Sequence, residues 1–328
     1  MTVTGTRTAR LVALLAALTL LAAACGGGGG GGGDGGGGDG GEALAEDIDL
    51  EGAQVGVGSK EFTEQLIVGN MAAIALEAAG AQVDNQVGII GTNVVRQALE
   101  SGEIDMYWEY TGTGWITILG HTDPIADERE QYLAVAEEDL EKNSIVWLEP
   151  APMNNTYALA MGPDATEELG IETLSEVAEL EDDQLTLCAD AEFLSRDDGL
   201  PGLEEHYGFE FPEGNITELD LGVIYAATGA GEQCNFGEVF ATDGRIQAQD
   251  LTVLEDDQDF FPKYNLAMTI REDTYQENDS AYDELFNAIA EELTNETMTD
   301  LNAQVDVEGE DAEDVAEQFL VDNGIISG

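Results

Sequence analysis

The chain has 328 residues, with 69 acidic side chains against 10 Lys and Arg and a formal net charge of −59. A field of this sign repels nucleic acid and anionic membrane surfaces, so neither is expected as a partner. Self-repulsion on this scale opposes folding in dilute solution, which favours a salt-rich external medium over a generic acidic surface kept for solubility.

The first 25 residues have the pattern of a bacterial export signal. Arg7 and Arg10 precede an apolar stretch, residues 11–24, which is shorter than the roughly 20 residues that a membrane-spanning helix needs. Three alanines then precede Cys25, as at a lipoprotein cleavage site. We expect lipid on Cys25 to anchor the protein to the outer face of the cell membrane. The alternative is an ordinary signal peptide in which the cysteine is incidental.

A glycine-rich segment follows the expected signal. Residues 26–41 are all glycine except Asp34 and Asp39. Glycine has no side chain to bury and loses much backbone entropy on ordering, so residues 26–51 are expected to form a flexible tether reaching roughly 25–30 Å. The folded part is expected to begin near Gly52. From there on, no segment approaches 18 consecutive apolar residues, the pattern of a membrane-spanning helix.

The remaining chain alternates predicted strands and helices. Strands are expected at 53–57, 82–87, 104–108, 145–148, 185–188, 218–221, 251–254 and 264–270, and helices at 62–79, 92–101, 126–142, 201–207, 280–293, 297–303 and 311–323. This alternation favours mostly parallel sheets, and the length suits two α/β lobes. We assign lobe 1 to 52–155 and 265–328 and lobe 2 to 156–264, with a small-ligand cleft between them.

Catalytic patterns are missing from the sequence. His121 and His206 are the two histidines, and neither is near a serine or cysteine in a nucleophile arrangement. Gly56 and Gly58 do not complete a dinucleotide or phosphate loop, and no set of convergent metal ligands is evident. We therefore expect neither an enzyme nor a metal or cofactor site. An anchored hydrolase on a two-lobed scaffold is the disfavoured alternative.

Two cysteines lie beyond Cys25. In an oxidising compartment, Cys188 and Cys234 form a candidate disulfide, and two buried free thiols are the alternative.

Scarce cations and grouped aromatic residues indicate a binding site. Lys60 follows the first predicted strand, and Arg196 lies in an expected loop of the second lobe. From opposite lobes, the two side chains could hold one carboxylate, although local salt bridges explain them equally well. Aromatic residues at strand ends and crossings are more often core packing. If their faces converge, however, they can enclose a quaternary ammonium group by cation–π interaction.

Four segments resemble one family together. Residues 58–65 (GSKEFTEQ), 107–113 (YWEYTGT), 155–159 (NTYAL) and 241–246 (ATDGRI) are similar to the glycine betaine/choline substrate-binding proteins of osmoprotectant ABC importers. The resemblance runs in order from Gly52 to the C-terminus. It implies the two-lobed type II periplasmic binding protein fold, with a permease and an ATPase as partners of a monomeric binding protein. A lipid-anchored sensor of osmolytes without a transport role is the alternative.

The resemblance also implies roles for individual residues. Tyr110, Tyr157 and Tyr264 match tyrosines of an aromatic box for trimethylammonium, and Phe240 stands where the family commonly has a fourth, a departure that keeps the ring and removes the hydroxyl. The polar positions that match the family's ligand-binding or cleft-lining residues are Lys60, Gln65, Thr113, Asn155, Glu192 and Arg196. The implied ligand is glycine betaine, choline, carnitine or proline betaine. Lys60 and Arg196 together favour a betaine, because choline has no carboxylate.

Overall fold

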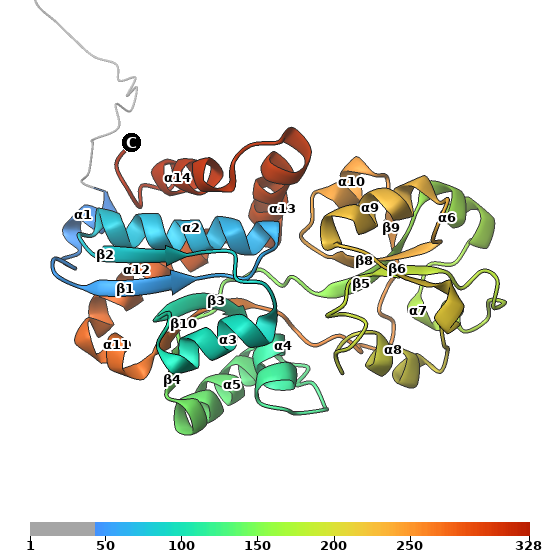
Figure 1. Ribbon diagram of the computed structural model, residues 1–328, viewed down its shortest axis with the longest axis horizontal. Coiled ribbons are helices and arrows are strands. Elements are labelled where there is room, and N and C mark those ends of the chain that lie inside the picture. Colours follow the sequence, from blue (N-terminus) through green and yellow to red (C-terminus); the bar gives the residue numbers. More distant parts are fainter. Residues whose placement is uncertain (1–42) are drawn as a thin grey trace, which may run out of the picture. The chain divides into compact units, whose positions relative to one another are not determined.

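Two five-stranded sheets organise residues 43–328, the part of the chain that the computed structural model describes. The first sheet has the order β2-β1-β3-β10-β4 and the second has the order β7-β6-β8-β5-β9. Each sheet lies in its own lobe (Figure 1), as the two-lobed α/β prediction requires. The predicted export signal, Cys25 and the glycine-rich segment lie outside the described residues.

Lobe 1 is built from both ends of the described chain. Its strands are β1 Gln54–Gly58, β2 Gln82–Gln86, β3 Met106–Tyr110, β4 Ile145–Trp147 and β10 Leu266–Arg271. Its helices are α1 Leu44–Asp47, α2 Thr63–Ala78, α3 Thr92–Ser101, α4 Thr111–Thr113, η1 Gly114–Ile118, α5 Glu128–Asn143, α11 Glu272–Glu277, α12 Asp279–Glu292, α13 Asn295–Ala303, η3 Gln304–Glu308 and α14 Ala312–Asp322.

Lobe 2 is formed by the middle of the chain. Its strands are β5 Tyr157–Met161, β6 Leu187–Ala189, β7 Ile216–Glu218, β8 Phe236–Phe240 and β9 Thr252–Val253. Its helices are α6 Pro163–Leu169, α7 Leu174–Val177, α8 Leu200–Tyr207, η2 Glu213–Asn215, α9 Leu221–Ala230 and α10 Arg245–Ala248. None of the helices within residues 43–328 has both the length and the apolar character needed to cross a bilayer.

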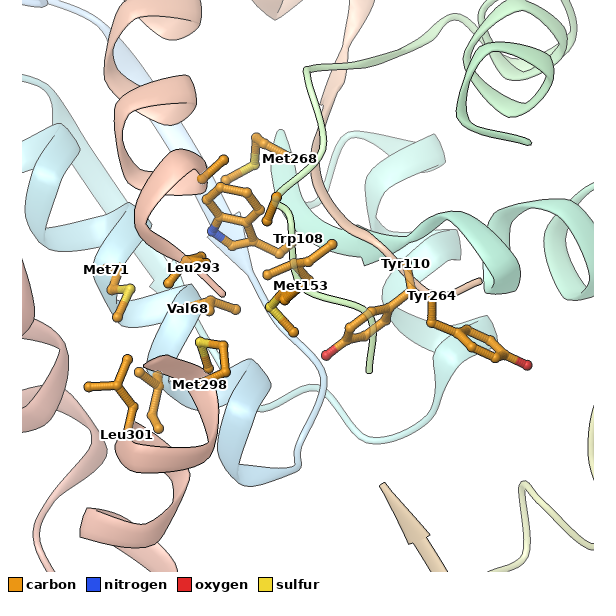
Figure 2. Packing of buried hydrophobic residues seen from close by; sticks show 14 of the residues in the cluster. Val68, Met71, Trp108, Tyr110, Met153, Tyr264, Met268, Leu293, Met298 and Leu301 are labelled. Carbon is orange, nitrogen blue, oxygen red and sulfur yellow. The ribbon is translucent and has the colours of Figure 1, made fainter. Parts of the chain in front are cut away.

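Side-chain alternation explains how the first sheet is covered on both faces. In β3, Trp108 packs with buried residues of α2 and α12, whereas its neighbour Tyr107 packs with residues of α3 and α5. Successive strand residues point to opposite faces, so a strand covered on both sides carries apolar residues on both faces. Glu109 is the one charged residue of β3, and its buried carboxylate is paired with Lys60. Figure 2 shows Val68, Met71 and Trp108 in the interior, with Tyr110 and Tyr264 at the edge of this core.

The prediction of mostly parallel sheets is confirmed for four strands of each sheet and is wrong for the fifth. β1 is parallel to β2 and β3, and β6 is parallel to β7 and β8. β10 runs antiparallel to β3 and β4, and β5 runs antiparallel to β8 and β9. β5 and β10 are the strands that follow the two crossings between lobes. Each therefore enters its sheet from the neighbouring lobe, in the direction opposite to the strands beside it.

The expected end of the tether also needs correction. Residues 44–50, which were expected to belong to the tether, are part of the folded structure. Leu44 and Ala45 donate backbone hydrogen bonds to carbonyls of Gly324 and Ile325, and Ala45 and Leu50 are buried. These small and apolar residues cover the end of α2 and the C-terminal segment, an outcome that local glycine content could not indicate.

Several elements of lobe 2 differ from the prediction. The strand expected at 218–221 ends at Glu218, and α9 begins at Leu221. β5, β8 and α9 were not predicted. The sequence of α9, LGVIYAATGA, is apolar almost throughout, so it carries no helical alternation of polar and apolar residues. β8 contains a glycine and a buried glutamate, which mask its strand character.

Cys188 and Cys234 are joined by a disulfide, with a Cα–Cα distance of 5.7 Å. Both cysteines are buried beside Ile224 of α9. The bond ties β6 to the loop that leads into β8, and these two strands are neighbours in the second sheet. It therefore fixes the part of lobe 2 that ends at Phe240.

Candidate functional site

One cavity between the lobes gathers nine of the ten residues expected to bind a ligand. They are Lys60, Tyr110, Thr113, Asn155, Tyr157, Glu192, Arg196, Phe240 and Tyr264. Five further residues, which the sequence reasoning did not select, complete the lining: Glu61, Phe62, Thr92, Asp190 and Leu221. In lobe 1 the lining comes from the loop after β1, the end of β3, the first residue of α3 and the last residue of α4. In lobe 2 it comes from the start of β5, the loop after β6, the end of β8 and the first residue of α9, and the two crossings complete it.

The aromatic side chains are brought together by strand ends. Tyr157 opens β5 and pairs in register with Phe240, the last residue of β8. Their ring centroids are 5.2 Å apart, and the Tyr157 and Tyr264 rings meet edge to face at 5.7 Å. Tyr110 ends β3 on the lobe 1 side. The four rings therefore share one cavity rather than separate cores.

Phe62 is a fifth ring that the sequence reasoning missed. It immediately precedes α2, and its ring lies 6.3 Å from that of Tyr110 and 5.2 Å from that of Phe240. It thus connects the rings of the two lobes. Phe62 was visible as an aromatic residue beside Lys60, but nothing local to it showed that a side chain before the helix turns into the cleft.

The Tyr264 ring depends on a glycine. A Cβ atom at Gly112 would lie 2.7 Å from a carbon of this ring, well inside van der Waals contact. The ring therefore packs directly on the backbone of α4, the short helix that follows β3. The hydroxyl of Tyr264 donates a hydrogen bond of 2.8 Å to Asp198, which fixes the orientation of the ring within the cavity.

Lys60 and Arg196 approach the cavity from opposite lobes, each held by a buried acid. The Lys60 Nζ lies 2.7 Å from Glu109 and 5.1 Å from the centre of the Tyr110 ring. Arg196 makes two hydrogen bonds to Asp198, of 2.8 and 2.6 Å, and its Cζ lies 5.6 Å from the centre of the Tyr157 ring. Such pairing holds both cations in place while offsetting much of the cost of burying them.

Both cations keep donors that the acids do not use. The ammonium of Lys60 has three N–H groups, of which Glu109 accepts one. The remaining contacts of the Arg196 guanidinium, to Glu192 and to Thr113, are long at 3.4 Å. An anionic group in the cavity could therefore receive hydrogen bonds from both side chains without displacing Glu109 or Asp198.

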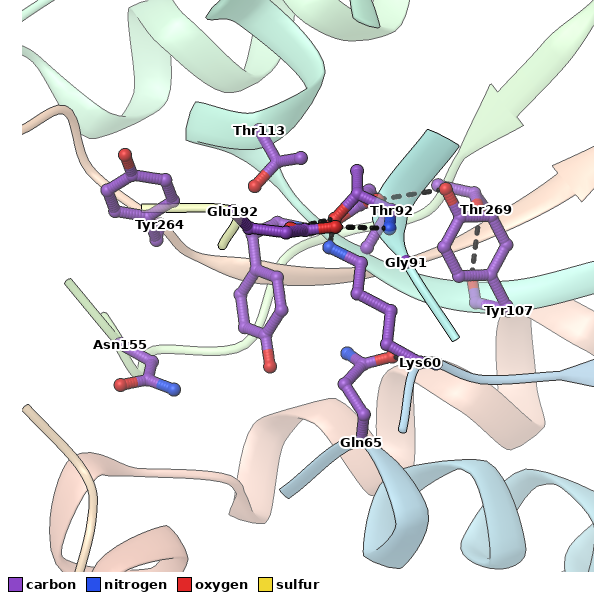
Figure 3. A network of polar contacts seen from close by, with 12 residues as sticks. Lys60, Gln65, Gly91, Thr92, Tyr107, Thr113, Asn155, Glu192, Tyr264 and Thr269 are labelled. Carbon is purple, nitrogen blue, oxygen red and sulfur yellow. Dashed lines mark hydrogen bonds and ion pairs between the residues drawn. The ribbon is translucent and has the colours of Figure 1, made fainter. Parts of the chain in front are cut away.

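Glu192 connects the two lobes directly. Its carboxylate accepts hydrogen bonds of 2.7 Å from the Thr92 backbone N–H and 2.9 Å from the Thr92 hydroxyl, at the start of α3 (Figure 3). Burial by itself raises the pKa of Glu192, but these hydrogen bonds and the charges of Lys60 and Arg196 outweigh burial and lower it. The contact is therefore fully formed at neutral pH and weakens only when acid protonates the carboxylate.

Gly91 gives the chain the backbone turn that leads into α3 and this contact. It precedes Thr92 with φ at +91°, a conformation that residues with a side chain rarely adopt. A Cβ atom at this position would meet the Glu192 carboxylate at 3.7 Å, an ordinary contact distance, so the backbone conformation and not space requires glycine here.

Gln65 is the one predicted residue that does not line the cavity. It is fully buried, and its side-chain oxygen accepts a hydrogen bond of 3.2 Å from the Lys60 backbone N–H. It therefore supports the loop that carries Lys60 (Figure 3). The sequence showed that Gln65 matches a ligand-binding position of the family. Whether its side chain faces the cavity depends on the rotation of α2 about its axis.

The crossings between the lobes run next to one another. Asn154 and Asn265 form a β-bridge, and the Tyr264 backbone N–H donates a hydrogen bond to the Asn154 side chain. The Asn155 backbone N–H donates in turn to the Tyr264 carbonyl. Two crossings, two α/β lobes and one enclosed aromatic cavity define a solute-binding protein of the two-lobed class.

Comparison with known proteins identifies the family. Residues 53–322 match the model of the substrate-binding domain of ABC-type glycine betaine transport systems. The chain belongs to this family, whose members are extracytoplasmic solute-binding proteins that work with ABC permeases and are not enzymes.

Two glycine betaine-binding proteins are similar in sequence to most of this chain. A glycine-betaine-binding protein of Pseudomonas aeruginosa is 38% identical over 278 residues, which cover 82% of this chain and 88% of that protein. The glycine betaine-binding protein YehZ of Escherichia coli is 35% identical over 277 residues, covering 82% of this chain and 90% of the relative. The apo structure of YehZ has a TM-score of 0.62 and covers 83% of this chain and 99% of its own.

Proposed function

We propose that this protein captures glycine betaine or a closely related trimethylammonium osmolyte outside the cell and delivers it to an ABC permease. The observation that carries this proposal is the shared cavity of Tyr110, Tyr157, Phe240 and Tyr264, with Lys60 and Arg196 at its border. A trimethylammonium group has no N–H to donate, so aromatic faces are its suitable surroundings, each contributing about 0.5–2 kcal/mol when desolvated.

The polar part of the cavity suits the other end of a betaine. The unused N–H groups of Lys60 and Arg196 and the Thr113 hydroxyl would hold the carboxylate, while Asn155 and Glu192 border the same space. Gln65 supports this arrangement through Lys60. A ligand of about eight heavy atoms is limited to roughly −12 kcal/mol, and micromolar binding corresponds to about −8 kcal/mol.

Titration calorimetry tests the ligand class. Glycine betaine, carnitine, proline betaine and choline are titrated in low and in high salt, with glycine as the control that lacks the methyl groups. We expect betaines to bind more tightly than choline, because choline leaves the donors of Lys60 and Arg196 unused. No heat from any quaternary amine would contradict the proposal.

High salt should raise the thermal unfolding midpoint of a chain with net charge −59, because salt screens the repulsion between its acidic side chains.

The same proposal includes a lipid anchor at Cys25 and a monomeric binding unit. A Cys25→Ser variant is expected to leave the membrane fraction and appear in the medium, since the tether would then have no attachment. Its light-scattering mass should equal that of one chain. Retention of the variant in washed membranes would contradict the anchor.

A further inference from the structure

A buried acid outside the cavity contacts one of its rings. Glu64, in the first turn of α2, is 2% exposed and does not line the cavity. Its Oε1 accepts hydrogen bonds from the Tyr110 hydroxyl at 2.7 Å and from Asn155 Nδ2 at 2.9 Å. Its Oε2 accepts from the Thr242 hydroxyl at 2.6 Å and from Asn302 Nδ2 at 3.2 Å.

The neighbours of Glu64 are oriented as donors. The Thr242 backbone N–H donates to Asn155 Oδ1 at 3.3 Å, which turns the amide N–H₂ of Asn155 toward Glu64. Asn302 Nδ2 also donates to the Thr242 carbonyl at 2.9 Å, which fixes the second amide in the same sense. Four donors on two oxygens match the ionised carboxylate.

Glu64 makes no ion pair with any Lys, Arg or His among residues 43–328. Lys60, the cation nearest in sequence, is paired with Glu109. Burial raises the pKa of Glu64, and the four donated hydrogen bonds act against burial. A buried acid without a partner cation is costly, so a positive charge arriving nearby would stabilise its ionised form.

We infer that Glu64 is a specificity-determining residue for a cationic ligand, acting through the Tyr110 hydroxyl that it holds. A phenol that donates its hydrogen bond to a carboxylate has a more electron-rich ring, and cation–π attraction grows with the negative charge on the ring face. The same hydrogen bond fixes the rotation of the Tyr110 ring. Glu64 thus supplies a negative charge behind the aromatic box without occupying space inside it.

The contacts of Glu64 span both lobes. Glu64 and Tyr110 belong to lobe 1, Asn155 lies at the first crossing, and Thr242 belongs to lobe 2, two residues after Phe240. The orientation of the Tyr110 ring in lobe 1 is therefore connected, through Glu64 and Thr242, to the end of β8, which carries Phe240 in lobe 2. This inference rests on the proposed function and adds a residue to it that does not touch the ligand.

Glu64→Gln tests the role of the charge, because glutamine has nearly the same shape. The paired probes are glycine betaine and 3,3-dimethylbutanoate, which has carbon in place of the ammonium nitrogen and keeps the carboxylate. We expect Glu64→Gln to weaken glycine betaine binding about tenfold, and binding of the carbon analogue by less than about twofold. Affinities are measured by calorimetry or by competition in tryptophan fluorescence.

Two matched variants complete the experiment. Glu77→Gln makes the same charge change on an exposed residue of α2 and should leave both affinities unchanged. Tyr110→Phe removes the hydroxyl that Glu64 accepts from and keeps the ring. It should reproduce the selective loss, and combining it with Glu64→Gln should add little. It also serves as the test if Glu64→Gln does not fold.

The outcomes separate this inference from the proposed function. Equal losses for both probes would show that Glu64 only supports the structure, and unchanged betaine binding would show that its charge is irrelevant. Either result overturns the inference while the wild-type protein still binds betaine. Wild-type protein that binds no quaternary amine would overturn the proposed function itself.

Discussion

Replacing Tyr110 or Tyr264 by alanine is expected to weaken glycine betaine binding by about tenfold or more, because each change removes a ring from the enclosed cavity. The effect of Tyr264→Ala should be the larger. Its hydroxyl also donates to Asp198, which holds the Arg196 guanidinium in place. Losing this ring therefore loosens the cation at the carboxylate end of the site as well.

Calorimetry on the two variants measures the loss, and thermal unfolding shows whether the fold is intact. Tyr275→Ala is the matched control, because Tyr275 is a partly buried tyrosine of α11 and does not line the cavity. Unchanged betaine affinity in both cavity variants, with normal unfolding, would contradict the aromatic box.

Removing the disulfide is expected to destabilise the protein by about 4 kcal/mol, since Cys188 and Cys234 are 46 residues apart and the bond restricts the unfolded chain over that whole loop. The double variant Cys188→Ala and Cys234→Ala should show this loss as a lower urea midpoint. Phe240 ends the strand beside β6, so weaker ligand binding should accompany the loss of stability.

Thiol titration provides the control for this experiment. In a Cys25→Ser background, the unfolded protein should show no free thiol before reduction and two after it. Reduced protein should then unfold at a urea concentration close to that of the double variant. Two reactive thiols before reduction would show that the bond does not form. A loss of stability below about 1 kcal/mol would show that the bond contributes little.

The sequence determined much of lobe 1 because its elements carry strong local patterns. The strand at 54–58, the helix at 63–78 and the helix at 92–101 were predicted to within about two residues. In lobe 2 the local signal was weaker. α9 lacks polar and apolar alternation, and β8 has a glycine and a buried acid in its centre, so neither was recognised.

The residues that line the cavity were predictable in kind but not in arrangement. Motifs spread over the chain named Tyr110, Tyr157 and Tyr264. The fold then placed their rings together at the end of β3, at the start of β5 and in the crossing before β10. Phe62 was missed because its inward direction depends on how α2 enters lobe 1. The antiparallel directions of β5 and β10 were missed because they follow from the two crossings between lobes.

The tertiary structure decided the polar contacts between residues far apart in sequence, whereas pairs such as Arg196–Asp198 join near neighbours in the chain. The sequence showed eight cations after the signal and an abundance of acids, so no particular pair could be selected. Folding brings Lys60 to Glu109, 49 residues away, and Glu192 to Thr92, 100 residues away. Local sequence determines which residue types are available. Contacts at such separations depend on the packing of whole elements, because electrostatic interactions are strong only between groups that packing buries together.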